Sequence, residues 1–192
     1  MLERMIKPSE NPFAILMWIL ITLQFGLTGC IAVDSRARDE SISIEATANL
    51  SGRFYNFASY RSERAGFMAV YKLSDFLQIY PGHGAHSVDV GFKNSELTFQ
   101  FVDDFGKPLN SKTYRVGDGL GFTTDGKIEL LTTSGCGGRD TPGFGCGSIT
   151  KILFVNSQGQ LVAVQSGGGA GLLGIFPFGV YAELISIFDR WQ

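Results

Sequence analysis

The sequence predicts a mainly β fold, an antiparallel barrel or sandwich of hairpins with one short α-helix. Apolar and polar residues alternate with a period of two in runs such as 88–92, 96–101 and 113–116, which is typical of strands with one buried face. Turn-forming residues separate these runs. The chain of 192 residues also holds 25 glycines and 16 phenylalanines, a composition that suits a turn-rich sheet protein.

The first 29 residues have the pattern of a bacterial lipoprotein signal peptide. Arg4 and Lys7 precede an apolar run over 13–25, which ends in small residues before a cysteine. The segment Leu27-Thr28-Gly29-Cys30 resembles a lipobox. That resemblance implies cleavage between Gly29 and Cys30 and a diacylglycerol on the Cys30 sulfur, usually with an acyl chain on the new amino group.

Two other interpretations of this stretch stay open. Residues 13–33 are about long enough for an uncleaved transmembrane helix, and a buried helix of a cytosolic protein is the third possibility. Glu3 and Glu10 make the leading segment less positive than is usual, although a start at Met5 would remove Glu3. Under the lipoprotein interpretation, Ile31 stands where an inner-membrane retention signal would place Asp, which implies an outer-membrane, periplasm-facing location.

Three regions are predicted: a signal peptide over 1–29, the lipidated cysteine and a tether over 30–49, and a single mainly β domain over 50–192. The tether is expected because 31–49 is polar and of mixed charge, with no glycine or proline. The formal net charge of −2, with no polybasic stretch, argues against a nucleic-acid partner. The expected partners are the membrane, through the lipid, and an envelope protein or cell-wall component.

The first elements of the domain are a strand and a helix. The aromatic segment 52–58 predicts a strand. Apolar residues then recur at the spacing of one helical face, at Leu73, Phe76, Leu77 and Tyr80. Pro81 and Gly82 are expected to end this helix, which is so short that it depends on packing for its stability.

The next elements are hairpins. Alternation over 88–92 and 96–101 around a turn at 93–95 predicts the first one. After a loop at 104–110 and a strand at 113–116, Asp125-Gly126 predicts a two-residue turn between 121–124 and 127–132.

The last third of the chain is predicted to be strands with one flexible break. Residues 149–155 lack alternation at their end, which favours a strand covered on both faces, and 156–159 suit a type I turn before a strand at 161–165. The glycine run at 167–171 predicts a flexible break. Residues 180–188 fit a helix or a strand, and we favour the strand.

Cys136 and Cys146 are predicted to form a disulfide. They are an even pair in a chain whose export signal indicates an oxidising compartment, and no histidine lies near them to suggest zinc. The glycine-rich loop between them would display Arg139, Asp140 and Phe144, a candidate contact surface.

His83, His86 and Asp89 are weak candidates for a metal site, because imidazole and carboxylate groups bind divalent ions but a loop does not preset their spacing. The glycine run lacks the Gly-Lys-Ser/Thr of a phosphate-binding loop, and no nucleophile elbow is present. The sequence therefore predicts no cofactor and offers no catalytic residue.

The order of segments resembles that of small envelope lipoproteins of Gram-negative bacteria. The matching parts are LSGRFYNF, the short helix near LSDFLQIY, and a glycine-rich turn before GLLGIFPFG. The resemblance implies an envelope location and carries no activity. The leading hypothesis is therefore a lipid-anchored binding or structural module, and the alternative is a carrier of a small apolar ligand in a barrel cavity lined by phenylalanines.

Overall fold

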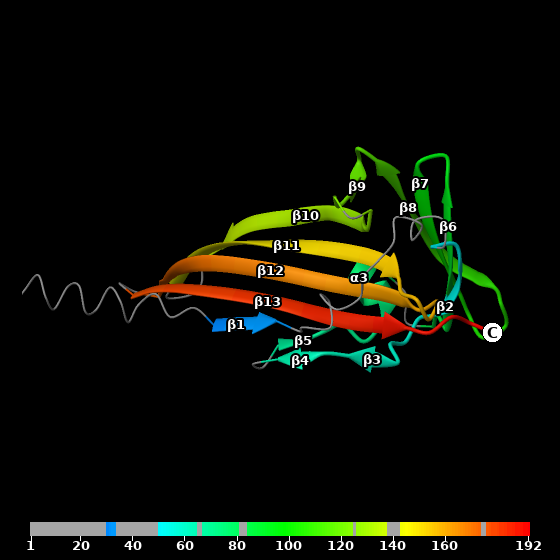
Figure 1. Ribbon diagram of the computed structural model, residues 1–192, viewed down its shortest axis with the longest axis horizontal. Coiled ribbons are helices and arrows are strands. Elements are labelled where there is room, and N and C mark those ends of the chain that lie inside the picture. Colours follow the sequence, from blue (N-terminus) through cyan, green and yellow to red (C-terminus); the bar gives the residue numbers. More distant parts are fainter. Residues whose placement is uncertain are drawn as a thin grey trace, which may run out of the picture.

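A computed structural model describes residues 30–33, 50–64, 67–80, 84–124, 126–137, 143–173 and 176–192 (Figure 1). The predicted signal peptide lies outside this part of the chain. The described helix is α3 (Leu73–Leu77). The described strands are β1 (Cys30–Val33), β2 (Gly52–Tyr55), β3 (Tyr60–Arg61), β4 (Glu63–Arg64), β5 (Phe67–Met68), β6 (Ser87–Lys93), β7 (Glu96–Val102), β8 (Pro108–Val116), β9 (Gly119–Phe122), β10 (Ile128–Gly137), β11 (Gly143–Val155), β12 (Leu161–Leu173) and β13 (Phe176–Phe188).

Most of these strands belong to one sheet. Its order is β1-β13-β12-β11-β10-β9-β8-β7-β6-β2, with β3 also paired to β13, while β4 and β5 form a separate pair. Neighbours are antiparallel except for β1 with β13 and β8 with β9, which are parallel. The prediction of a mainly β, mostly antiparallel fold with one short helix is confirmed. Within the described residues, no helix is long and apolar enough to span a bilayer.

The barrel alternative is wrong, because the sheet does not close: β2 and β13 form no strand pair with each other. β2 instead contacts the short segment after β13, through the bridge between Phe54 and Arg190 and through backbone bonds such as Tyr55 N to Asp189 O, 2.9 Å. The sheet instead curls like a sandwich, so that β6, β7 and β8 stand across β10 to β13 (Figure 1). The strands β11, β12 and β13 have 13 residues each, about 40 Å, and extend beyond the curled part.

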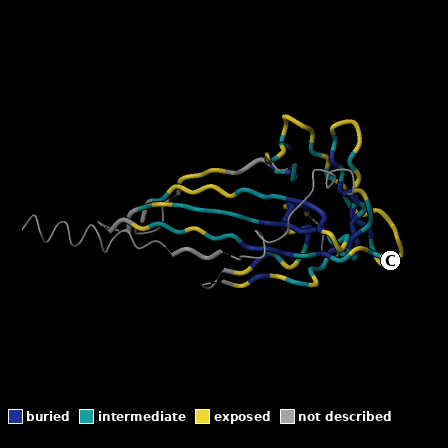
Figure 2. Tube along the Cα trace, in the orientation of Figure 1, coloured by how far each residue is buried: buried dark blue, intermediate teal, exposed yellow. Residues whose placement is uncertain are grey.

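A single main core fills the concave side of the curled sheet. Buried residues of α3 pack there with strand residues from both halves, including Phe54, Val88, Phe99, Phe101, Leu120, Ile128, Leu153, Leu161 and Phe188. Figure 2 shows that buried residues gather where the sheet curls and that the outer halves of the long strands are intermediate or exposed. A smaller cluster of Phe154, Val162, Val164 and Ile185 lies on the opposite face of the sheet, which confirms that 152–155 are covered on both sides.

The helix α3 is shorter than predicted. Leu73, Phe76 and Leu77 are buried as expected, but the helix ends at Leu77 because Gln78 adopts a left-handed conformation with φ of 55°. Tyr80 therefore leaves the helical face, and it is 68% exposed. The prediction of Tyr80 as a core residue was wrong because spacing alone cannot show where a helix stops.

Asn56 holds α3 in place from inside the core. It is fully buried, and its side-chain Nδ2 donates to Ala85 O at 2.9 Å while its Oδ1 accepts from Ser74 N at 3.0 Å. Its backbone accepts from Leu73 N and donates to His86 O. One residue thus joins the end of β2, the first turn of α3 and the segment that leads into β6.

The predicted turns are largely correct. Residues Lys93 and Glu96 pair directly, and Asn94 and Ser95 between them have positive φ angles of 54° and 64°, as a tight hairpin requires. The turn at 156–159 is closed by Gly159 N donating to Asn156 O. The turn around position 125, itself outside the described residues, is longer than the two residues predicted, because Thr123 N donates to Lys127 O at 2.9 Å.

The glycine run at 167–171 is not a break, since β12 continues through it to Leu173. A Cβ atom at Gly169 would lie 3.0 Å from Cys146 O, and one at Gly147 would lie 3.0 Å from Gly168 O. Such contacts are tighter than nine in ten that real Cβ atoms make, so a side chain at either position would push the neighbouring backbone away by a few tenths of an ångström. Glycine therefore favours the close approach of β11 and β12. The glycines shape the sheet rather than interrupt it.

The tether prediction needs a correction at its start. Residues 30–33 form β1, with Cys30 opposite Val180 and Val33 opposite Glu183 of β13. This apolar, partly β-branched segment covers part of the free edge of β13, and β3 covers the edge further along at Ser186 and Ile187. Residues 34–49 lie outside the described part. The strand favoured for 180–188 is confirmed by β13.

The disulfide between Cys136 and Cys146 is confirmed. The two residues stand directly opposite each other on β10 and β11, with Cα atoms 4.0 Å apart. Part of the loop predicted between the cysteines is strand instead, since Gly137 belongs to β10 and residues 143–145 belong to β11. Residues 138–142 lie outside the described part. The bond joins β10 to β11 in the outer half of the sheet, away from the main core.

Replacing Asn56 with alanine should lower the free energy of unfolding by about 2–4 kcal/mol, because Ala85 O and Ser74 N would be left buried without partners. Urea unfolding followed by tryptophan fluorescence measures this change. Asn110→Ala is the matched control, since the bond of the Asn110 amide to Tyr80 O is exposed, and it should cost less than about 1 kcal/mol. Equal effects of the two substitutions would contradict the role given to Asn56.

Denatured but unreduced protein should show no free thiol at positions 136 and 146 when treated with a thiol-labelling reagent. The double variant Cys136→Ser/Cys146→Ser should lose about 2–3 kcal/mol of unfolding free energy in the chain-entropy treatment of a short closed loop. Labelling of both cysteines in protein taken from an oxidising compartment would refute the disulfide.

Candidate functional site

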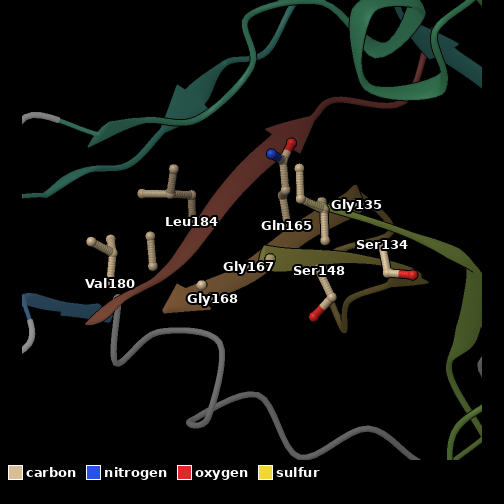
Figure 3. Close-up of a pocket in the computed structure, with 12 residues that line it drawn as sticks. Ser134, Gly135, Ser148, Gln165, Gly167, Gly168, Val180 and Leu184 are labelled. Atoms are coloured by element: carbon tan, nitrogen blue, oxygen red, sulfur yellow. The ribbon is translucent and has the colours of Figure 1, made fainter. Parts of the chain in front are cut away.

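An apolar trough on the sheet is the main candidate site. It has a volume of about 610 Å³ and lies over the outer halves of β10 to β13. Its lining residues are Ser134, Gly135, Gly147, Ser148, Ile149, Gln165, Gly167, Gly168, Gly169, Val180, Ala182 and Leu184. In Figure 3 the side chains of Val180, Leu184 and Gln165 project to the same side of the sheet as α3, whereas Ser148 points away.

The trough is an extension of the face that forms the main core. The strand register places Gln165, Gly167 and Gly169 of β12 on one face, opposite Leu184, Ala182 and Val180 of β13. Ala163, which lies on the same face of β12 two residues from Gln165 toward the core, is buried. One continuous sheet face therefore starts as core and becomes an open trough where the covering elements end.

Glycines form the floor of the trough and account for its depth. Gly167 and Gly169 of β12 lie beside Ile149 and Gly147 of β11, so little side-chain volume rises from the middle strands. Ile149 of β11, which is 39% exposed, and Val180 and Ala182 of β13 supply the apolar surface of the trough. The space exists because the glycines that permit the close strand approach also leave the face empty.

The inner end of the trough is polar. Lys151 of β11 stands opposite Gln165 of β12 in the register, one row closer to the core than Ile149 and Gly167. A second cavity of about 170 Å³ adjoins this end and shares Ile149 with the trough. Its other lining residues are Leu77, Gln78, Lys112, Tyr114, Leu130 and Lys151.

The two lysines of this small cavity also cap α3. Lys112 Nζ donates to Leu77 O at 3.0 Å, and Lys151 Nζ donates to Phe76 O. The last turn of α3 contains no basic residue of its own, so β8 and β11 supply the cations that helix carbonyls favour. The pKa of Lys151 is lowered from its ordinary value, first by burial and then by the nearby charge of Lys112.

The residues proposed as a metal site belong to separate networks. Asp89 makes a two-pronged ion pair with Arg53, with N–O distances of 2.6 and 2.7 Å, which raises the pKa of Arg53. His86 Nδ1 lies 2.7 Å from Asp104 Oδ1, and the His86 ring packs against Trp191. His83 lies outside the described residues. Within them, no group of three His, Cys, Asp or Glu residues is close enough to hold an ion.

The candidate contact loop is largely outside the described part of the chain. This applies to Arg139 and Asp140, while Phe144 falls on β11 near the outer end of the sheet.

The sequence contains a signal for the trough, separate from the hairpin pattern. Alternate positions of 180–184, namely Val180, Ala182 and Leu184, are apolar, and alternate positions of 165–169 are a glutamine and two glycines. Their meeting on one face depends on the register between β12 and β13.

A comparison with protein-family models and with curated proteins found no match for this chain.

Proposed function

We propose that this chain is a lipid-anchored envelope protein whose folded domain binds an elongated apolar ligand in the trough over β10 to β13. The trough carries this proposal. Its volume of about 610 Å³ falls in the range of small-molecule sites, and its lining combines apolar surface with a few polar groups at one end.

The exposed apolar surface of the trough favours a ligand thermodynamically. Each Å² of apolar surface removed from water contributes roughly 25 cal/mol, so an apolar chain laid against Ile149, Val180 and Ala182 would gain from both surfaces. The lining residues follow β12 from Gln165 to Gly169 and β13 from Leu184 to Val180, so an apolar chain can lie along these strands.

The position of Cys30 supports a link between anchor and trough. Cys30 pairs with Val180, a residue that lines the trough. A diacylglycerol on Cys30 would hold this outer part of β13 close to the membrane surface. Two or more acyl chains give stable attachment, since each buried methylene contributes about 0.8 kcal/mol. The trough would then lie next to a source of lipid, at the outer membrane if Ile31 acts in sorting as proposed.

This proposal narrows the two hypotheses raised by the sequence. The general binding module becomes a module for apolar ligands, and the carrier is kept with an open trough in place of a barrel cavity. An envelope protein or cell-wall component as partner would depend on the loop at 138–142, which lies outside the described residues.

Cells that express Cys30→Ala should release the protein from the membrane fraction, or retain it as an uncleaved precursor of higher mass, because the lipid can no longer be attached. Fractionation with immunoblotting distinguishes the mature from the precursor form. A Cys30→Ala protein of mature mass that still sediments with the membrane would sink the lipid-anchor proposal.

The substitution Ala182→Phe should reduce the binding of apolar ligands at least about tenfold, since a phenyl ring would occupy the floor of the trough. Binding is measured with the uncharged fluorescent probe N-phenyl-1-naphthylamine, and native mass spectrometry of protein purified from its host identifies lipids that stay bound.

Ala170→Phe is the matched control for this experiment. Ala170 lies on β12 three residues from Gly167 and therefore on the opposite face, where it is exposed. It should leave binding unchanged. Equal binding by wild type and Ala182→Phe, with no lipid retained by either, would rule out the trough as the ligand site.

A further inference from the structure

We infer that the ligand of the trough is a single acyl chain with an anionic head group, whose head lies between Lys112 and Lys151 and whose tail extends over the glycine floor. This inference rests on the proposed apolar-ligand function and adds to it the chemistry and the direction of the ligand.

The two cavities lie next to each other. The small cavity that contains Lys112 and Lys151 adjoins the inner end of the trough, with Ile149 as a shared wall. Lys151 also stands next to Gln165, a trough residue, in the pairing of β11 with β12. A ligand that fills the trough therefore ends beside two ammonium groups and one amide.

Lys112, Lys151 and Gln165 keep hydrogen-bonding capacity for a ligand. An ammonium group has three donors, and in each lysine one of them is directed at a carbonyl of α3. No carboxylate among the described residues forms an ion pair with Lys112 or Lys151, and the Gln165 amide makes no hydrogen bond to any described residue. Donors thus remain for the oxygens of an anion.

The electrostatics of the two lysines also favour an anion. Burial lowers the pKa of Lys151, and the nearby charge of Lys112 lowers it further. An anion between them would offset both costs, because charge-assisted hydrogen bonds to carboxylate or phosphate are stronger than neutral ones. If the two lysines served only to cap α3, there would be no reason for an apolar trough to open beside them.

The direction of the chain follows from these positions. With its head at Lys151, a tail would pass Gln165 and the row of Ile149, Gly167 and Ala182, and would then reach Val180, opposite Cys30. The shared chemistry of the ligand is an acyl chain that ends in an anion. A fatty acid would supply a carboxylate, and a lysophospholipid would supply a phosphate.

The experiment compares probes that have equal tails and different heads. The full protein, reconstituted in phosphatidylcholine nanodiscs so that no single-chain detergent competes for the trough, is loaded with N-phenyl-1-naphthylamine, which is then displaced by decanoate, decyl phosphate or decanol. The signal of empty nanodiscs is subtracted. Wild type should bind at least one of the two anions about tenfold more tightly than decanol. The preferred anion shows whether the natural ligand is a carboxylate or a phosphate.

The variant Lys112→Met/Lys151→Met should abolish this preference: affinity for the anion falls about tenfold, and affinity for decanol does not fall. Lys127→Met is the control, because Lys127 Nζ lies over the ring of Phe154, on the opposite face of the sheet, and the variant should keep the preference. If the double variant does not fold, the single variants Lys112→Met and Lys151→Met are each expected to reduce the preference.

Two failures can be told apart. If wild type binds decanol as tightly as both anions, or if the lysine variants keep the preference, the anionic head group is refuted while the apolar trough stands. If wild type binds neither the dye nor any probe, the proposed apolar-ligand function itself is wrong.

Discussion

The position of α3 is the constraint on which the rest of the structure depends. A helix of five residues has almost no stability of its own, so it must be held by tertiary contacts. Asn56 binds its first turn from the end of β2, and Lys112 and Lys151 bind its last carbonyls from β8 and β11. Three distant segments therefore meet on one short helix, which ties β2, β8 and β11 together.

The same helix divides the long strands into a core half and an open half. Where α3 and the strands across from it cover the sheet, Leu153, Leu161 and Ala163 are buried. Beyond this cover the face continues as the trough. The lysines that cap the helix stand at the boundary, so one pair of side chains closes the core and forms the polar end of the proposed ligand site.

Glycine has two roles in the open half. At Gly147 and Gly169 it lets β11 and β12 approach each other without the shift of a few tenths of an ångström that a Cβ atom would impose. On the trough face the absence of side chains leaves room for a ligand. This part of the sheet has little core, and it is joined by the bond between Cys136 and Cys146 and edged by β1. The open sheet face next to these links is the site proposed for an apolar chain.

The sequence by itself determined the local features: the hairpin turn at Asn94-Ser95, the buried face of α3 up to Leu77, and the pairing of the two cysteines. These depend on neighbours in the chain or on the number of thiols, which a sequence shows directly. Only the tertiary structure decided that the sheet stays open, that the glycine run continues β12, and that Lys112 and Lys151 converge on one cavity. Register and curvature decide these features, because they set which distant residues share a face, and neither quantity is encoded in the spacing of residues along a single strand.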